Sequence, residues 1–142
     1  MNERRQAILL VVLLIPAIAG LYAATQLIQP APVQPSVVRA VRLEAVGVDW
    51  TIVYDAILTT NNTAFSLLME ASHALGFPVA YVPYGVPRGM FVTAINGSVN
   101  GEGNRYWQYW VGGAYGDVAA DLKPLRDGDT VLWKFVLSVE GG

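Results

Sequence analysis

Aromatic side chains are concentrated in the segment Arg105–Val111, which reads RYWQYWV. Tyrosine and tryptophan rings offer a ligand or a protein partner a large contact area at little cost in conformational entropy. Because side chains alternate along a strand, Tyr106 and Trp110 share one face. Trp107, Tyr109 and Val111 share the other face. We assign the Trp107 set to the core, which leaves Tyr106 and Trp110 as an exposed platform.

Two neighbouring segments could extend this platform. A loop rich in Asn, Gly and Ser occupies residues 96–104, and an apolar segment interrupted by prolines occupies residues 77–84. Loops of this composition supply positive φ angles and adaptable polar groups. Covering a sheet face or joining two copies of the chain is equally compatible with the same residues. The candidate ligand-binding residues are Tyr106, Trp110, Tyr81, Tyr84, Asn96, Asn100 and Asn104.

Residues that commonly act in catalysis or metal binding are sparse. His73 is the only histidine, and helical spacing places it near Ser66 and Glu70 on a polar, solvated face. One histidine and one glutamate do not supply the three or four ligands of a metal site. A Ser-His-Asp set, a carboxylate pair and a phosphate-binding loop are all missing from the sequence, so we predict that the protein is not an enzyme.

Four aspartates near the carboxyl end invite a calcium interpretation. They lack the Asp-x-Asp-Gly order of a calcium-binding loop, and an Asp-Gly pair is typical of a turn before a strand. We therefore predict turns and no metal site. These residues are Asp117, Asp121, Asp127 and Asp129.

Charge and cysteine content narrow the class of protein further. The chain has a net charge of −2, and because Met1–Ile28 contributes +1, the remainder carries −3. Its Lys and Arg residues are scattered, so we do not expect nucleic acid binding. There are no cysteines, which excludes disulfides, thiolate metal sites and a lipoprotein anchor. The folded part must therefore be held together by packing.

An uncharged apolar run near the amino terminus predicts a membrane segment. Arg4 and Arg5 precede Ala7–Ile28, which as a helix would be about 33 Å long and could span a bilayer. By the positive-inside rule, the amino terminus is cytoplasmic and the rest is extracytoplasmic, as in a single-pass protein of the cell membrane. Ala17-Ile18-Ala19 permits the alternative of a cleaved signal peptide, which would make the protein secreted.

The sequence beyond this segment divides into a short stalk and one domain. Residues 29–36 contain three prolines, which favour an extended polyproline II stalk. Residues 37–142 are long enough for a single small core. Asn61 and Asn96 begin N-x-S/T sequences in predicted loops, so both are candidate glycosylation sites of an exported, cell-surface glycoprotein.

Hydrophobic periodicity predicts an α+β domain. Alternating positions indicate strands, i, i+3, i+4 spacing indicates one amphipathic helix, and the two strands around the 96–104 loop are expected to form a hairpin with a long turn. A β-grasp (ubiquitin-like) fold satisfies this order, with one helix on a mixed sheet and the last strand beside the first. The expected elements are strands Val37–Gly47 and Asp49–Leu58, helix Ala64–Leu75, an edge strand or extended loop within Phe77–Tyr84, and strands Met90–Ile95, Arg105–Val111 and Thr130–Val139.

Three stretches of the domain resemble a known family. They read NNTAFSLLMEA, FVTAINGSVNGEGNRYWQYWVGG and LKPLRDGDTVLWKF, and the resemblance to the transcobalamin C-terminal-like domain covers Arg39–Val139. One departure is Val111-Gly112-Gly113, where that family usually has Val-Asn-Gly. The resemblance implies an exported β-grasp module. In transcobalamin and intrinsic factor, the matching domain closes over one face of cobalamin, so cobalamin becomes a candidate ligand by resemblance.

Together these features predict a membrane-tethered extracytoplasmic binding module. Its site would be the face around Tyr106, Trp110 and the 96–104 loop, and its ligand a cobalamin-like small molecule, a glycan or a neighbouring surface protein. The alternative is a structural or adhesive surface protein that associates with itself or with other envelope proteins.

Overall fold

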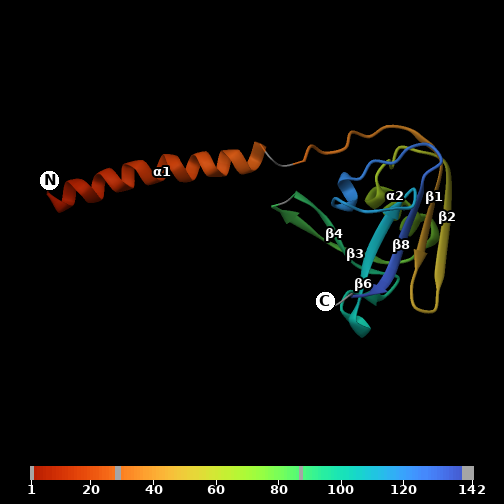
Figure 1. The fold of residues 1–142 in the computed structure, drawn as a ribbon. Coiled ribbons are helices and arrows are strands. Elements are labelled where there is room, and N and C mark those ends of the chain that lie inside the picture. Colours follow the sequence, from red (N-terminus) through yellow and green to blue (C-terminus); the bar gives the residue numbers. More distant parts are fainter. Residues whose placement is uncertain (1, 28–29, 87, 139–142) are drawn as a thin grey trace. The chain divides into compact units, whose positions relative to one another are not determined.

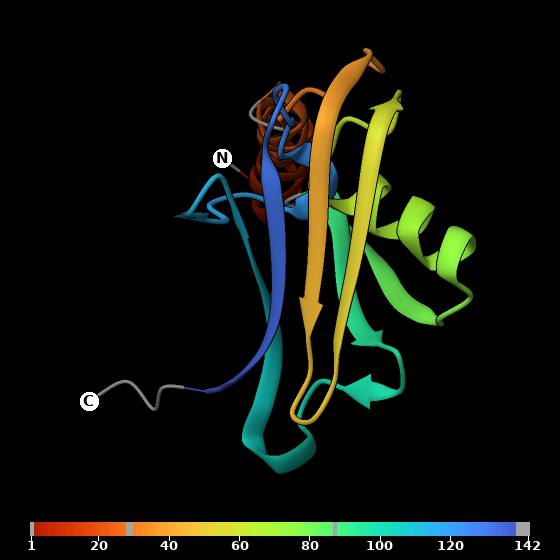
Figure 2. The same ribbon diagram turned by 90° about the vertical axis from the view of Figure 1, so that its right-hand side faces the viewer.

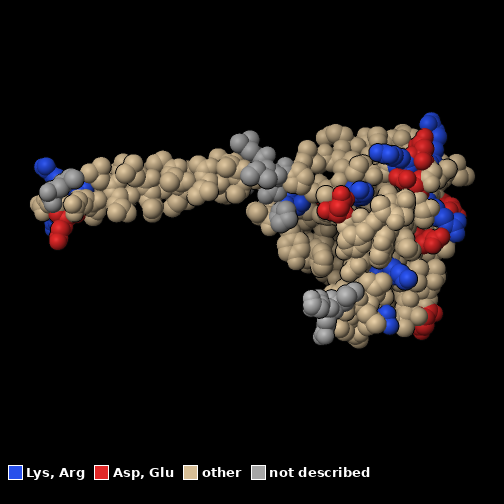
Figure 3. All heavy atoms as spheres, in the orientation of Figure 1, with Lys and Arg blue, Asp and Glu red and all other residues tan. Residues whose placement is uncertain are grey.

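The computed structural model describes residues 2–27, 30–86 and 88–138, and these form two separate units (Figure 1). The first unit, Met1–Pro30, contains helix α1 (Glu3–Leu27), which has Pro16 in its interior. By length and composition α1 could cross a membrane, and a signal sequence has the same properties. Figure 3 shows charged side chains only at its amino-terminal end. The chain thus has an amino-terminal apolar helix that is a candidate membrane span.

The segment predicted as a stalk does not stand free of the domain. Its first residue, 29, and the predicted end of the span, 28, lie outside the described residues. Farther along, the Asn62 side-chain amide donates hydrogen bonds to the Gln34 carbonyl at 3.1 Å and to the Ser36 hydroxyl at 3.0 Å. These bonds hold the end of the predicted stalk against the loop before α2, within the second unit, Ala31–Gly142.

The second unit has the predicted α+β composition, with helix α2 and a mixed sheet. A five-stranded sheet has the order β2-β1-β8-β6-β7, and a three-stranded sheet has the order β3-β4-β5. Strands β1 and β8 run parallel, so the last long strand lies beside the first, as we expected. The described elements are β1 Val38–Val46, β2 Thr51–Thr59, α2 Ala64–Leu75, β3 Val79–Gly85, β4 Arg88–Ile95, β5 Ser98–Val99, η1 Glu102–Asn104, β6 Arg105–Val111, β7 Ala114–Tyr115, η2 Ala120–Leu122 and β8 Thr130–Leu137.

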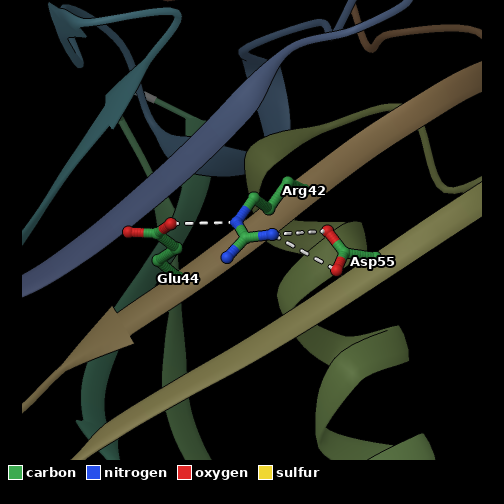
Figure 4. A network of polar contacts seen from close by, with 3 residues as sticks. All are labelled: Arg42, Glu44 and Asp55. Carbon is green, nitrogen blue, oxygen red and sulfur yellow. Dashed lines mark hydrogen bonds and ion pairs between the residues drawn. The ribbon is translucent and has the colours of Figure 1, made fainter.

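In the first hairpin, β1 follows the predicted alternation, whereas β2 departs from it at its end, where Leu58 is exposed and Thr59 is buried. Leu43 and its neighbours at i±2 are buried, whereas Arg42 and Glu44 point to the opposite face. Arg42 bonds Glu44 at 2.9 Å and both carboxylate oxygens of Asp55 on β2 at 3.2 and 3.3 Å (Figure 4). These carboxylates raise the pKa of Arg42. Because the network is exposed, its effect on stability is small.

Helix α2 begins and ends at the predicted residues. The Thr63 hydroxyl accepts a hydrogen bond from the Ser66 amide at 3.0 Å, and the Ser66 hydroxyl accepts one from the Thr63 amide at 3.0 Å. Gly76 ends the helix with φ of 74°. This reciprocal cap and the left-handed glycine satisfy the free backbone groups at both ends. The helix buries the side of Leu67 and Leu68 in the core.

The long hairpin predicted between Met90–Ile95 and Arg105–Val111 is wrong, because these strands belong to different sheets. Asn96 and Gly97 have φ of 48° and 82° and form a two-residue turn that pairs β4 with the short strand β5. Positive φ at both turn residues matches the right-handed twist of a tight hairpin. The chain then turns again and enters the five-stranded sheet as β6, antiparallel to β8.

The proline-interrupted segment is an edge strand, which is one of the two predicted possibilities. β3 lies at the edge of the three-stranded sheet, where Pro83 does not interrupt a ladder on both sides. The last strand, predicted as Thr130–Val139, is described as far as Leu137, and Val139 lies outside the described residues.

The aromatic residues of β6 and β8 form much of the core. Trp107 stacks on Phe135 with ring centroids 5.0 Å apart, and Tyr109 packs against Trp133 at 5.1 Å. Trp107, Tyr109 and Val111 are all buried, which confirms the assignment of the Trp107 set to the core. Figure 2 shows α2 and the three-stranded sheet behind the strands of the larger sheet, on the side of this core.

The backbone at Gly116 lies close to the ring of Tyr109, and this contact provides a test of the core packing. A Cβ atom on Gly116 would lie 2.2 Å from the Tyr109 ring. We expect Gly116→Ala to lower the free energy of unfolding by about 1–3 kcal/mol, since Tyr109 must move within a packed core. The matched control is Gly85→Ala, where nothing lies within 4 Å of the added methyl group. Urea unfolding followed by tryptophan fluorescence measures both, and equal stabilities would contradict this packing.

Candidate functional site

The candidate platform lies on the face of the five-stranded sheet opposite the core, which we call the outer face. Tyr106 and Trp110 of β6 point there, because Trp107 and Tyr109, which alternate with them, are buried on the other side. Tyr115 of β7 lies directly across from Trp110, with ring centroids 5.5 Å apart and an interplanar angle of 74°. Tyr106 is 40% exposed and Tyr115 57%, so two ring surfaces are available to a ligand.

Strand β8 completes the outer face with both apolar and polar groups. Leu132 lies across from Trp110, and Val136 lies across from Tyr106. Between these two pairs, Gln108 is opposite Lys134. An amide and an ammonium group therefore lie between two apolar pairs, which suits a ligand with a flat apolar surface and hydrogen-bond acceptors.

The three candidate asparagines differ in what their side chains do. Asn100 links the two sheets, because its amide donates to the Val92 carbonyl at 3.0 Å and its oxygen accepts from the Trp107 amide at 2.8 Å. Asn96 and Asn104 are exposed and have positive φ, which favours asparagine over most residues. Asn100 is therefore a structural residue in this arrangement, whereas the other two side chains remain accessible.

The structure separates Tyr81 and Tyr84 from the outer face. Both lie on β3 in the three-stranded sheet. Tyr81 makes an edge-to-face contact with Phe65 of α2 at 4.9 Å, and Tyr84 makes a similar contact with Phe91 of β4 at 5.8 Å. The predicted set of ligand-binding residues thus falls on two surfaces, and the larger sheet contributes only Tyr106 and Trp110.

Removing the Asn100 side chain tests its structural role. We expect Asn100→Ala to lower the free energy of unfolding by about 2 kcal/mol, since two hydrogen bonds between the sheets are lost in a partly buried place. The control is Asn96→Gly, because glycine adopts the same positive φ without strain. Urea titration of both variants is the measurement. An Asn100→Ala variant as stable as the control would return Asn100 to the group of candidate ligand contacts.

The cluster of hydrogen bonds around the carboxylate of Glu70 on α2 was not predicted from the sequence. Glu70 accepts hydrogen bonds from the Tyr54 hydroxyl at 2.8 Å, from the Asn61 amide at 2.6 Å and from the Thr59 hydroxyl. Burial alone would raise the pKa of Glu70, but these three bonds outweigh it and lower the pKa below the usual 4.5. Glu70 therefore stays ionised and is poorly suited to act as a proton donor or acceptor. Only β2, α2 and the loop between them together create this cluster.

Glu70 lies at the wall of an open hollow of about 700 Å³ on α2. Phe65 and Met69 also line it, and so does the exposed His73, whose Nδ1 is 2.8 Å from the Met69 carbonyl oxygen. His73 is on the solvated side of the helix, as predicted. The Asn61 amide nitrogen, the predicted attachment atom for a glycan, is engaged with Glu70, whereas Asn96 is exposed in its turn.

The Glu70 cluster predicts a specific pH dependence of stability. Because its folded pKa is lowered, Glu70 stabilises the domain fully above the unfolded pKa and loses that contribution as the pH falls through the folded pKa. We expect Glu70→Gln to cost about 1 kcal/mol at neutral pH and nothing in acid. The control is Glu102→Gln, at an exposed residue of η1. Urea unfolding across pH measures this, and a difference that persists unchanged in acid would contradict it.

The four aspartates accept hydrogen bonds from backbone amides or from a lysine side chain. Asp127 accepts from the Arg39 amide at 2.8 Å and Asp129 from the Arg126 amide at 2.8 Å, so both support the predicted turn. Asp121 accepts from the Met90 amide at 2.8 Å, and Asp117 pairs with Lys123 at 3.1 Å. Among the residues that the structure describes, no group of three or more His, Cys, Asp or Glu side chains could hold a metal ion.

Tyr109 is a buried tyrosine with a strongly raised pKa. Burial, assisted by the charge of Asp117, raises the pKa of Tyr109 to about 12. Its hydroxyl donates a hydrogen bond to the Val118 carbonyl and so ties β6 to the connection before η2. This tyrosine stays protonated and has a structural role.

The fold and the exposed face define a small α+β domain that follows an apolar amino-terminal helix. The chain belongs to the family described as Domain of unknown function (DUF4430), whose model matches residues 61–136. No curated protein matches the sequence.

Two solved structures are similar in fold. One is a protein from Ruminococcus gnavus, described provisionally as metal binding, with a TM-score of 0.55, 17% identity, and coverage of 71% of this chain and 99% of that one. The other is haptocorrin in complex with Cbi, with a TM-score of 0.60, 16% identity, and coverage of 75% of this chain. The aligned part is 27% of the haptocorrin chain, so it corresponds to one part of that protein.

Proposed function

We propose that this protein is a membrane-tethered extracytoplasmic binding module with a β-grasp domain. The strand order β2-β1-β8-β6-β7 and the parallel pairing of β1 with β8 support the β-grasp assignment. The length and composition of α1, with Arg4 and Arg5 before its apolar part, support a single span with a cytoplasmic amino terminus. In this scheme residues 1–28 are the anchor, 29–36 the linker and 37–142 the domain.

One observation carries the binding role: Tyr106 and Tyr115 are exposed and Trp110 is half-buried on the face of the five-stranded sheet that lies opposite α2 (Figure 2). Rings of this kind bind flat, partly apolar surfaces such as a sugar ring or a corrin-like macrocycle. The structural similarity to haptocorrin in complex with Cbi supports the macrocycle. The ligand class is therefore a cobalamin-like small molecule or a glycan, and the role is binding without catalysis.

Substitutions on the outer face test this function. We expect Tyr106→Ala and Trp110→Ala each to weaken binding of the responsive ligand by about tenfold or more, since each removes a ring at the centre of the site. The full chain in detergent is titrated with cobalamin and with a panel of soluble oligosaccharides by calorimetry.

The matched control for these variants is Tyr84→Ala, which removes a ring from the other sheet. Binding that is unchanged in Tyr106→Ala and Trp110→Ala but lost in Tyr84→Ala would move the site to β3. Binding of neither ligand class by the native chain would contradict the proposed function.

A structural or adhesive role is the second candidate, and an exposed edge strand favours it. β2 lies at the edge of the five-stranded sheet, and Ile57 on it is 88% exposed. An apolar edge strand can pair with a strand of another chain. If sedimentation shows a dimer that Ile57→Lys dissociates, while no ligand binds, the adhesive role replaces the binding role.

A further inference from the structure

The β3–β4 hairpin carries exposed apolar side chains that the proposed ligand site does not use. In Figure 1 this hairpin extends beyond the rest of the folded unit. Val82 lies across from Phe91, and Tyr84 across from Gly89, so both strands contribute to the exposed surface. Val86, near the tip, is 69% exposed. We call the group the hairpin patch; its members are Tyr81, Val82, Tyr84, Val86 and Phe91.

The hairpin patch lies in a segment without negative charge. Between Leu75 and Gly101 the sequence has no Asp or Glu, and Arg88 is its only charged residue. Two of the five patch members are tyrosines, whose rings and hydroxyl groups suit the boundary between lipid and water. An apolar, acid-free hairpin with tyrosines has the composition of a surface that contacts the interface of a bilayer containing anionic lipids.

The linker keeps the domain close to any membrane that holds α1. Helix α1 ends at Leu27, and Asn62 fixes Gln34 and Ser36 to the domain. Six residues, 28–33, lie between the end of α1 and Gln34, and six residues span at most about 20 Å when extended. Within the folded unit, Figure 1 shows the hairpin tip at the end where residues 31–33 enter. A short tether of this kind gives a local concentration on the order of millimolar.

We propose that the hairpin patch inserts into the interfacial layer of the membrane that holds α1, and so orients the domain on the lipid surface. This inference rests on the proposed anchor. A patch of a few apolar side chains binds a membrane only weakly and reversibly on its own. Because the tether keeps the patch near the lipid, weak binding is sufficient here. β4 packs against η2 and the residue before it at Gly89 and Met90. Val82, Tyr84 and Val86 of the hairpin are nevertheless exposed and can contact a fluid interface.

The absence of cysteine from the chain permits a site-specific test. The full chain carrying Val86→Cys is spin-labelled and reconstituted in vesicles of equal parts phosphatidylcholine and phosphatidylglycerol. The matched control is Val48→Cys in the β1–β2 turn, since Val48 is 66% exposed. We expect the label at residue 86 to be protected from a water-soluble nickel chelate and accessible to oxygen, and the label at residue 48 to be accessible to the chelate. Equal chelate access at both would overturn the inference.

Two further measurements separate this inference from its alternatives. The first is extraction with alkaline carbonate: if it removes the chain from the vesicles, the proposed anchor is wrong. If the chain is retained but the label at residue 86 is accessible to the chelate, only the role of the hairpin is overturned. Protection that disappears when each nanodisc holds one copy shows that a second copy covers the patch, which also overturns lipid insertion. The variant Tyr84→Asp with Phe91→Asp is expected to restore chelate access at residue 86.

Discussion

The parallel pairing of β1 with β8 is the constraint on which the rest of the domain depends. Leu43 lies across from Val131 and Ala45 across from Trp133, and all four residues are buried. Parallel neighbours cannot be joined by a tight turn, so the chain between them must leave the sheet and return in the same direction. Helix α2, the three-stranded sheet and β6 all lie on that connection and cover the core that the pairing creates.

The aromatic residues of β6 follow from this arrangement. Because β6 pairs with β8, Trp107 and Tyr109 meet Phe135 and Trp133 and fill the core. The Trp107 indole also donates to the Ser98 carbonyl at 2.8 Å, whereas the Trp133 indole nitrogen is buried with no partner among the described residues. Trp133 therefore contributes mainly through apolar area. Alternation then sends Tyr106 and Trp110 to the outer face, so the same strand serves the core and the candidate site.

A domain without cysteines is held together here by packing and by side-chain hydrogen bonds between distant segments. Asn100 joins the two sheets, Asn62 holds the linker, and Glu70 connects α2 with β2. Each is a polar side chain that satisfies backbone or hydroxyl groups of another segment, and such groups are costly to leave unpaired when buried. They also define the available surfaces, because the asparagines and the carboxylate that form these bonds are not free to bind a ligand.

The sequence by itself determined what depends on local periodicity. Helix α2 has the predicted bounds, since Thr63 and Gly76 cap it, and alternation divides β6 into a buried Trp107 set and a Tyr106 set that is exposed or half-buried. Only the tertiary structure decided which strands pair. It placed β4 in another sheet from β6, assigned Asn100 to a structural role and gathered the partners of Glu70. These contacts join residues far apart in the chain, and their energies depend on the packing of the whole domain, which no local pattern encodes.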